Sequence, residues 1–208
     1  MDRREAVKYI TILMGGTVIG ADAFLTGCKT TGRQDEWTPD DISWINELGE
    51  SILPQTSSPG AKAANVGQFM TVMVNDCYEA ADQKVFREGI ESINKIADKK
   101  FGKSFMAITP EQRNTIAIEL DKEAKEYSKK VTAFDDIEKR NYIAAIKRGQ
   151  VDYRKKHMSV HYFTMMKQLT LLGFFTSQLG ATQAVRYLPV PGRYDGCVPY
   201  KKGDKLIV

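Results

Sequence analysis

Residues 159–179, SVHYFTMMKQLTLLGFFTSQL, form the segment around which the rest of this chain has to fold. A helix over this segment would be apolar nearly all round, through Phe163, Met166, Leu169, Leu172, Phe174 and Phe175. Such a helix is either buried among other helices or crosses a membrane. Lys167, Gln168 and Gln178 favour burial, so the sequence predicts a central helix that other elements cover.

The segments before it carry helix signals. Residues 38–41 (TPDD) and 109–112 (TPEQ) each place a hydroxyl at the N-cap, a proline at the first helical position and an acid in the first turn. Apolar spacing predicts helices over 38–52, 66–80, 82–100 and 109–129, and a charged helix over 130–158. Because strand signals are nearly absent, we expect an all-α domain, residues 38–208, of about five to seven helices. An extended tail rich in proline and glycine should follow from Tyr187.

The composition is that of a soluble globular protein, with 42% hydrophobic and 27% charged residues. The formal net charge is +4, and the basic residues are scattered along the sequence. A nucleic-acid-binding protein would concentrate them on one face, so this class of partner is not expected.

The N-terminus has the plan of an export signal. Residues 1–27 combine a charged start, an apolar run and a small-residue cleavage site. Arg3 and Arg4, followed by Lys8, resemble the twin-arginine pattern, with an ordinary Sec signal as the alternative. Residues 25–28 (LTGC) have the form of a lipobox, which makes Cys28 the expected lipidation site and 28–37 a polar tether. These features predict a protein anchored by lipid on the periplasmic side of the cell envelope.

The sequence offers no catalytic constellation. It lacks a G-x-G-x-x-G motif between a strand and a helix, a P-loop and a C-x-x-C-H haem motif. His157 and His161 would share one face of a helix, but the glutamate of a zinc protease motif is missing. We therefore expect no catalytic, cofactor-binding or metal-binding residues in this chain. Cys77 and Cys197 could pair, stay reduced or bridge to another chain, and the sequence does not decide.

Two motifs resemble one known family. Residues 52–62 (ILPQTSSPGAK) are similar to a signature loop of the gluconate 2-dehydrogenase subunit 3 family. Residues 169–177 (LTLLGFFTS) and 187–192 (YLPVPG) resemble its C-terminal helix and the segment that follows. The resemblance spans about residues 40–200, in the same order.

The resemblance implies a function for a chain without an active site. Members are small helical subunits of periplasmic sugar, sugar-acid or polyol dehydrogenases. Their large partner is a flavoprotein of the glucose-methanol-choline type that carries FAD, and a cytochrome c often accepts the electrons. The small subunit supplies the export signal, so that the twin-arginine translocase carries the folded partner across. The lipobox is a departure from members with a plainly cleaved signal, and implies that this chain also supplies the membrane anchor.

The expected partner contacts lie in the signature loop, the apolar helix and the tail: Pro54, Pro59, Gly60, Tyr162, Phe163, Phe174, Phe175, Tyr187, Pro191 and Cys197. The alternative for the loop is a rigid turn, for the aromatic residues a place in the core, and for the tail packing on its own chain. Two other functions also stay open. One is a stand-alone lipoprotein that binds a small molecule or sugar, and the other is an enzyme that uses His157 and His161.

Overall fold

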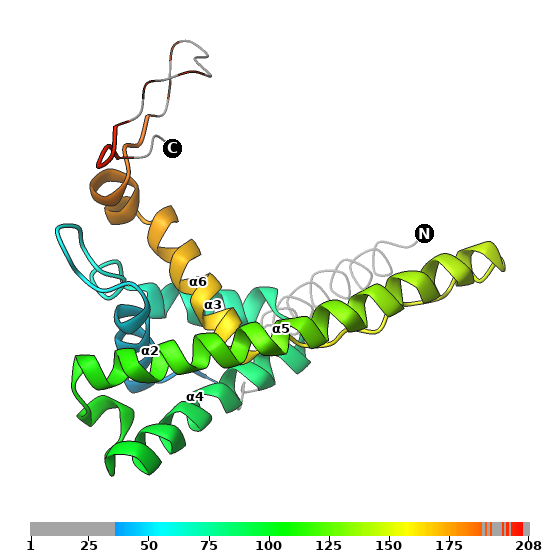
Figure 1. The fold of residues 1–208 in the computed structure, drawn as a ribbon, viewed down its shortest axis with the longest axis horizontal. Helices are drawn as coiled ribbons and strands as arrows, with labels where there is room; N and C mark the ends of the chain where they lie inside the picture. Colours follow the sequence, from blue (N-terminus) through cyan, green and yellow to red (C-terminus); the bar gives the residue numbers. More distant parts are fainter. Residues whose placement is uncertain are drawn as a thin grey trace, which may run out of the picture. The chain divides into compact units, whose positions relative to one another are not determined.

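The computed structural model describes residues 36–188, 190, 192, 197, 199 and 201–205. These residues form α-helices and no β-strand, which confirms the all-α prediction (Figure 1). The elements in chain order are α2 (Pro39–Ile52), α3 (Val66–Cys77), α4 (Ala80–Phe101), the 3-10 turn η1 (Phe105–Ala107), α5 (Pro110–Lys147), α6 (Tyr162–Thr176) and the π turn η2 (Gly180–Ala184).

Helix α6 is the centre of the domain, as its composition predicts. It contacts α2, α3, α4 and α5. Its buried positions are Phe163, Met165, Met166, Leu169, Thr170, Gly173 and Phe174. The neighbouring helices contribute fully buried side chains to the same core, among them Ile45 of α2 and Phe86 of α4. Burial of this apolar surface is the main driving force for folding.

Helices α2 and α3 approach each other closely because glycines lie where they meet. A Cβ atom on Gly67 would lie 2.5 Å from the carbonyl oxygen of Ile42, and one on Gly49 would lie 2.7 Å from Val66 Cγ2. Asn46 strengthens the contact by accepting a hydrogen bond from the backbone N–H of Gly67 at 2.7 Å. Larger residues at either glycine would push the two helices apart.

Both predicted helix starts are confirmed as capping boxes. At α2, the backbone N–H of Asp41 donates to Thr38 Oγ1 at 3.2 Å, and the Thr38 N–H donates to Asp41 Oδ2 at 2.9 Å. At α5, Thr109 and Gln112 make the same reciprocal pair at 3.4 and 3.0 Å. Each box satisfies backbone N–H groups that have no partner inside the helix.

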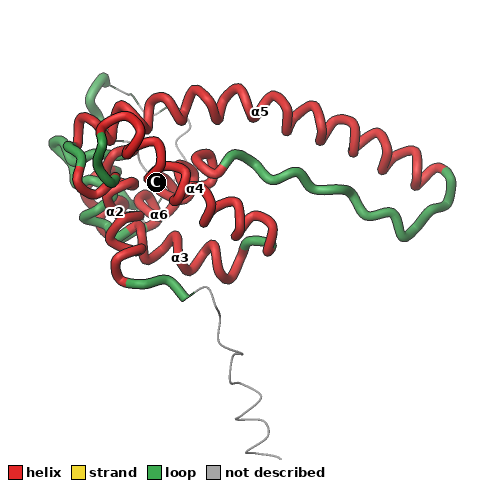
Figure 2. Tube along the Cα trace, turned by 90° about the horizontal axis from the view of Figure 1, so that it is seen from below, coloured by secondary structure: helices red, strands yellow, loops and turns green. Residues whose placement is uncertain are grey.

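The helix predicted to end near residue 129 instead continues to Lys147 as one element, α5. No glycine or proline interrupts residues 111–147, so nothing in the backbone stops the helix. It ends at Lys147, and Gly149 just beyond has a φ of +76°, a backbone conformation that glycine adopts more readily than other residues. The prediction of a helix over 130–158 is therefore wrong for residues 148–158. They form a non-helical return segment beside the C-terminal half of α5 (Figure 2).

Residues 38–208 form a compact unit by themselves. The predicted export signal 1–27, the lipidation site Cys28 and the tether up to residue 35 lie outside the described residues. Among the helices that are described, none combines the length and the apolar composition needed to cross a bilayer.

Candidate partner-binding surface

The signature loop is closed around one carboxylate. Glu50, in the last turn of α2, accepts hydrogen bonds from the backbone N–H of Gln55 at 2.7 Å and of Lys62 at 2.9 Å. The N–H of Ala61 donates to the Leu53 carbonyl at 2.9 Å, which joins the two ends of the loop. The loop is therefore a rigid turn built on a side chain that lies before it in sequence.

Gly60 is required by this arrangement. A Cβ atom at position 60 would lie 2.3 and 2.4 Å from the carboxylate oxygens of Glu50, and 2.6 Å from the backbone nitrogen of Gln55. Real Cβ atoms do not approach other atoms so closely. The glycine thus lets the carboxylate reach both N–H groups.

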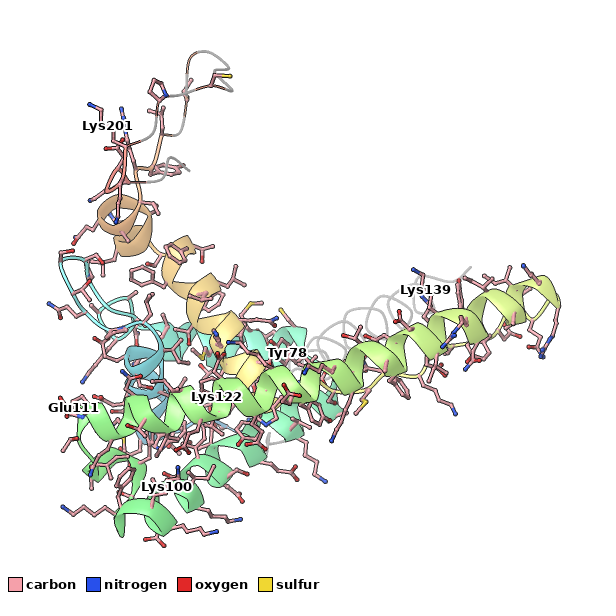
Figure 3. The ribbon with its side chains drawn as sticks, in the orientation of Figure 1. Tyr78, Lys100, Glu111, Lys122, Lys139 and Lys201 are labelled. Atoms are coloured by element: carbon pink, nitrogen blue, oxygen red, sulfur yellow. The ribbon has the colours of Figure 1, made fainter. Side chains whose placement is uncertain are left out.

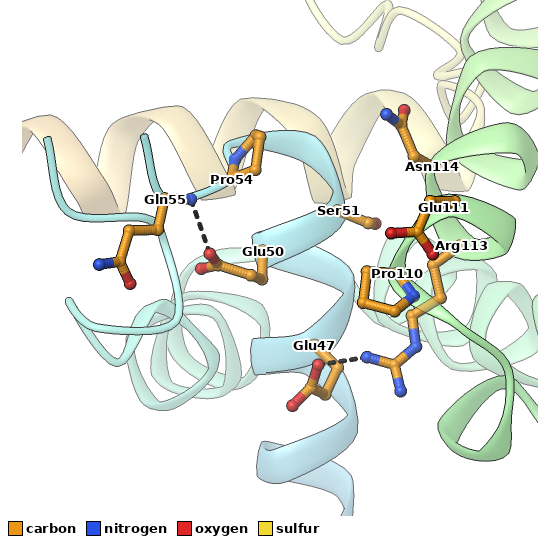
Figure 4. Close-up of a pocket in the computed structure, with 9 residues that line it drawn as sticks. All are labelled: Glu47, Glu50, Ser51, Pro54, Gln55, Pro110, Glu111, Arg113 and Asn114. Atoms are coloured by element: carbon orange, nitrogen blue, oxygen red, sulfur yellow. Dashed lines mark hydrogen bonds and ion pairs between the residues drawn. The ribbon is translucent and has the colours of Figure 1, made fainter. Parts of the chain in front are cut away.

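A pocket of about 360 Å³ lies between the end of α2, the signature loop and the start of α5 (Figure 4). Glu47 of α2 forms ion pairs across it with Arg113 of α5 and with Lys62 of the loop. Burial alone would raise the pKa of Glu47, but Lys62 and Arg113 outweigh it, and the pKa is lowered. Arg113 is itself fixed by the carbonyl oxygen of Phe105, which accepts from its Nε at 3.0 Å.

The C-terminal half of α6 presents apolar side chains that this chain leaves exposed. Leu171, Leu172 and Phe175 are 36%, 46% and 45% exposed. The Phe175 ring packs edge-on against the buried ring of Phe174, with 5.2 Å between centroids. This contact holds an exposed aromatic side chain in a defined position, as in the aromatic anchors of protein interfaces.

The tail starts from the same end of α6. A Cβ atom on Gly180 would lie 2.0 Å from the carbonyl oxygen of Phe174, so only glycine lets the chain turn so tightly there. The N–H of Val185 then donates to the Gly180 carbonyl at 3.1 Å, and Val185 is buried.

Tyr187 and Leu188 of the tail follow and are 57% and 37% exposed. Hereafter the α6 end surface means Leu171, Leu172, Phe175, Tyr187 and Leu188.

The segments that follow two of the predicted regions border one hollow. A hollow of about 440 Å³ is lined by residues 63–65, which follow the signature loop, and by residues of 177–183, which follow α6. Segments that lie more than a hundred residues apart in sequence thus border one recess, one directly after the signature loop and the other directly after α6.

The predicted contact residues divide by their exposure. Phe163 and Phe174 are buried in the core of this chain, as the alternative for the aromatic residues expected. Gly60 is also buried, Pro59 and Tyr162 are half-buried, and Pro54, Phe175, Tyr187 and Cys197 are exposed. Pro191 lies outside the described residues. Partner contact stays a prediction for the exposed members.

The two histidines do not share a helix face, because residues 157–161 are not helical. Exposed His157 contacts Asp82 of α4 through Nε2, at 3.1 Å. His161 is buried and caps α6, since its Nδ1 accepts from the backbone N–H of Phe163 at 3.2 Å. Each therefore has a separate structural contact. No cluster suited to a metal ion occurs in the part of the chain that the structure describes.

His161 makes stability depend on pH. Burial lowers its pKa, and nearby Glu123 of α5 offsets this only in part. The rings of Tyr127 of α5 and Tyr162 also lie against it. Because the folded-state pKa is below the ordinary 6.5, the unfolded chain takes up the proton more readily. The stability given by neutral His161 is present above pH 6.5 and is lost as the pH falls through the folded-state value.

We therefore expect His161→Asn to reduce the loss of stability between pH 7.5 and 5.5. Asparagine is a good N-cap that does not titrate, whereas protonated His161 loses a cap worth about 1 kcal/mol. Denaturant midpoints at the two pH values measure the effect, and His157→Asn is the control for the second histidine. An equal pH dependence in wild type and His161→Asn would contradict this role.

Residues 39–192 match the family model described as Gluconate 2-dehydrogenase subunit 3. The match begins at the first residue of α2 and includes the signature loop, α6 and the start of the tail. No curated protein and no solved structure matches the chain significantly.

Proposed function

The chain belongs to the gluconate 2-dehydrogenase subunit 3 family, and from this we propose that it is the small, non-catalytic subunit of a membrane-associated dehydrogenase complex. The large subunit would be a flavoprotein of the glucose-methanol-choline type, which holds FAD and oxidises a sugar, a sugar acid or a polyol. Substrate specificity would then lie in that subunit. A cytochrome c is the expected electron acceptor where a third subunit is present.

The α6 end surface is the observation that carries this proposal. Leu171, Leu172 and Phe175 lie within five consecutive residues at the C-terminal end of α6 and are exposed, and Tyr187 and Leu188 of the tail are exposed as well. Scattered exposed apolar residues are normal, whereas Leu172 and Phe175 are three residues apart and so share one face of the helix, which is the arrangement of an interface patch. The recess lined by residues 63–65 and by residues of 177–183 would receive side chains of the large subunit.

Export and anchoring complete the proposed role. Arg3, Arg4 and Lys8 would direct the chain to the twin-arginine translocase, which carries folded proteins. A flavoprotein bound to this chain would cross with it, already loaded with FAD. Lipid on Cys28 would then hold the complex at the periplasmic side of a membrane.

The pocket between α2 and α5 is the feature that would favour a stand-alone binding lipoprotein. Its volume of about 360 Å³ is within the range of small-molecule sites. Its principal charged groups are already engaged within the chain, Glu47 by Lys62 and Arg113, and Glu50 by the signature loop. A ligand would have to displace these contacts, so the subunit function is the better supported of the two.

Replacing Leu172 and Phe175 by serine is expected to reduce recovery of the flavoprotein at least tenfold, while the small subunit still folds. Both side chains are about half exposed, so the substitutions remove little of the core. Loss of a central aromatic anchor typically costs an interface about 2 kcal/mol or more. The measurement is a mild-detergent pull-down of the tagged chain from its native envelope, with the flavin absorbance of the eluate.

Met106→Ser is the matched control, because Met106 is an exposed apolar residue of the distant turn η1. It should leave recovery of the flavoprotein unchanged. A colourless wild-type chain that elutes alone would contradict the proposed function and favour the binding lipoprotein. Equal recovery with both variants would place the interface elsewhere.

A further inference from the structure

The C-terminal part of α5 and most of the return segment form a basic arm, residues 137–156. It contains seven lysine and arginine residues and two acidic residues, which gives a net charge of +5 against +4 for the whole chain. The C-terminal half of α5 and the return segment run side by side (Figure 2). The arm thus carries a larger net positive charge than the whole chain, because it holds few acidic residues to offset its basic ones.

The arm is held in shape by a buried carboxylate. Glu138 is buried and accepts three hydrogen bonds, each of 3.0 Å, from Asn141 Nδ2, the Tyr153 hydroxyl and the backbone N–H of Lys156. These bonds, led by the Lys156 N–H, lower the pKa of Glu138. The carboxylate therefore fastens the return segment to α5.

The two tyrosines of the arm are half-buried and make contacts within it. The Tyr142 and Tyr153 rings lie 6.3 Å apart, and Lys155 Nζ lies 4.5 Å from the centroid of the Tyr142 ring. Both tyrosine side chains are therefore partly occupied by contacts within the arm.

The outer face combines lysine with aliphatic residues. One face of α5 carries two lysines and two isoleucines: Lys139, Ile143, Ile146 and Lys147. Residues three or four positions apart lie on the same side of a helix, and Lys147 directly follows Ile146 at the edge of this face. Ile143 and Ile146 are 45% and 54% exposed, and Lys139 extends outward from this part of the helix (Figure 3). At the turn beyond α5, Val151 is 94% exposed.

We propose that this basic arm binds an anionic lipid surface. Lys139, Lys147 and Arg148 would lie among the lipid phosphates, and Ile146 and Val151 would insert between the headgroups. Basic residues beside exposed aliphatic residues are the composition by which helices bind at the surface of anionic membranes. An acidic protein is the less suitable occupant, because protein interfaces are enriched in exposed aromatic anchors, and the two tyrosines of the arm are half-buried and occupied by contacts within it.

The inference requires neither a lipid on Cys28 nor a dehydrogenase partner, so it can fail or hold independently of the proposed function. The test uses the compact unit 38–208, which lacks the apolar export signal and Cys28. This chain is sedimented with phosphatidylcholine vesicles, with and without phosphatidylglycerol, at low and at high salt. Binding is expected only with phosphatidylglycerol, and high salt should weaken it, because screening shortens the range of the attraction.

Changing Lys139, Lys147 and Arg148 to glutamine should lower vesicle binding about a hundredfold, since each basic residue contributes a factor of about five near an anionic surface. Ile146→Ser with Val151→Ser should weaken binding about tenfold or more by removing the inserted apolar groups. The matched control changes Lys84, Lys95 and Lys99 of α4 to glutamine, which removes the same charge from exposed positions elsewhere. Circular dichroism checks that each variant keeps its helices.

Three results would overturn the proposal: no binding to phosphatidylglycerol vesicles, wild-type binding by the arm variant, or an equal loss in the α4 control. The last would show that net charge alone attracts the chain. If the vesicles bind nothing while a cross-linker at Val151→Cys joins the arm to the large subunit of the purified complex, the arm is a protein contact instead.

Discussion

Gly60→Ala is expected to destabilise the domain by about 2 kcal/mol and to weaken its complex, although it adds a single methyl group. The new Cβ atom would overlap both carboxylate oxygens of Glu50 and the backbone nitrogen of Gln55. The carboxylate sits at the end of a flexible side chain and can move away, but the backbone nitrogen cannot. Either adjustment breaks the bonds that Glu50 makes to Gln55 and Lys62.

Glu50→Ala should produce a similar loss, because two backbone N–H groups lose a charged acceptor, and hydrogen bonds to charged groups contribute about 1.5–3 kcal/mol each when buried and less at partly exposed positions such as this one. The two substitutions act on the same contact, so the double variant should be less destabilised than the sum of the single ones. Denaturant midpoints of the wild type, the two single variants and the double variant give this coupling.

Ser57→Ala, an exposed position in the same loop, is the control and should leave the midpoint nearly unchanged. Additive effects of Gly60→Ala and Glu50→Ala would show that the glycine serves some purpose other than making room for the carboxylate. Unchanged stability in Glu50→Ala would show that the loop keeps its shape without that acceptor.

The structural features that the sequence predicts correctly are those set by contacts between residues close together in the chain. The capping boxes at Thr38 and Thr109 are patterns of four residues, and both form as predicted. The central position of α6 follows from its composition, because a helix with so little polar surface has to be covered. The same composition does not predict which residues of α6 are exposed. A helix that is apolar all round has no hydrophobic periodicity that would separate exposed Leu172 from buried Leu169.

The remaining features depend on contacts between distant residues. The predicted helix boundary near residue 129 is wrong because α5 continues through the charged residues that follow, where no glycine or proline interrupts the backbone. The carboxylate of Glu50 reaches N–H groups five and twelve residues away, and that of Glu138 reaches the N–H of Lys156. Such bonds leave no periodic pattern. The Pro59-Gly60 pair is the one local sequence feature that indicates the Glu50 contact, because glycine is the residue used where other atoms approach the backbone closely.

Arg3→Lys with Arg4→Lys is expected to have the largest effect, because it should stop export of both this chain and the flavoprotein proposed as its partner. A guanidinium presents a planar fork of donors, whereas an ammonium is a compact point charge, so lysine keeps the charge and loses the geometry that a receptor for twin arginines reads. If the flavoprotein depends on this chain for export, retaining one protein in the cytoplasm retains the other.

The measurement is the amount of each protein in periplasmic, membrane and cytoplasmic fractions, together with dehydrogenase activity of intact cells supplied with sugars, sugar acids and polyols. Arg33→Lys makes the same chemical change in the tether, beyond the predicted signal, and should leave export normal. Normal export of the double variant would assign the signal to the Sec route, which carries unfolded chains and cannot bring a folded flavoprotein across. Retention of this chain with normal export of the flavoprotein would separate the two functions, since the chain would then join its partner only after both had crossed.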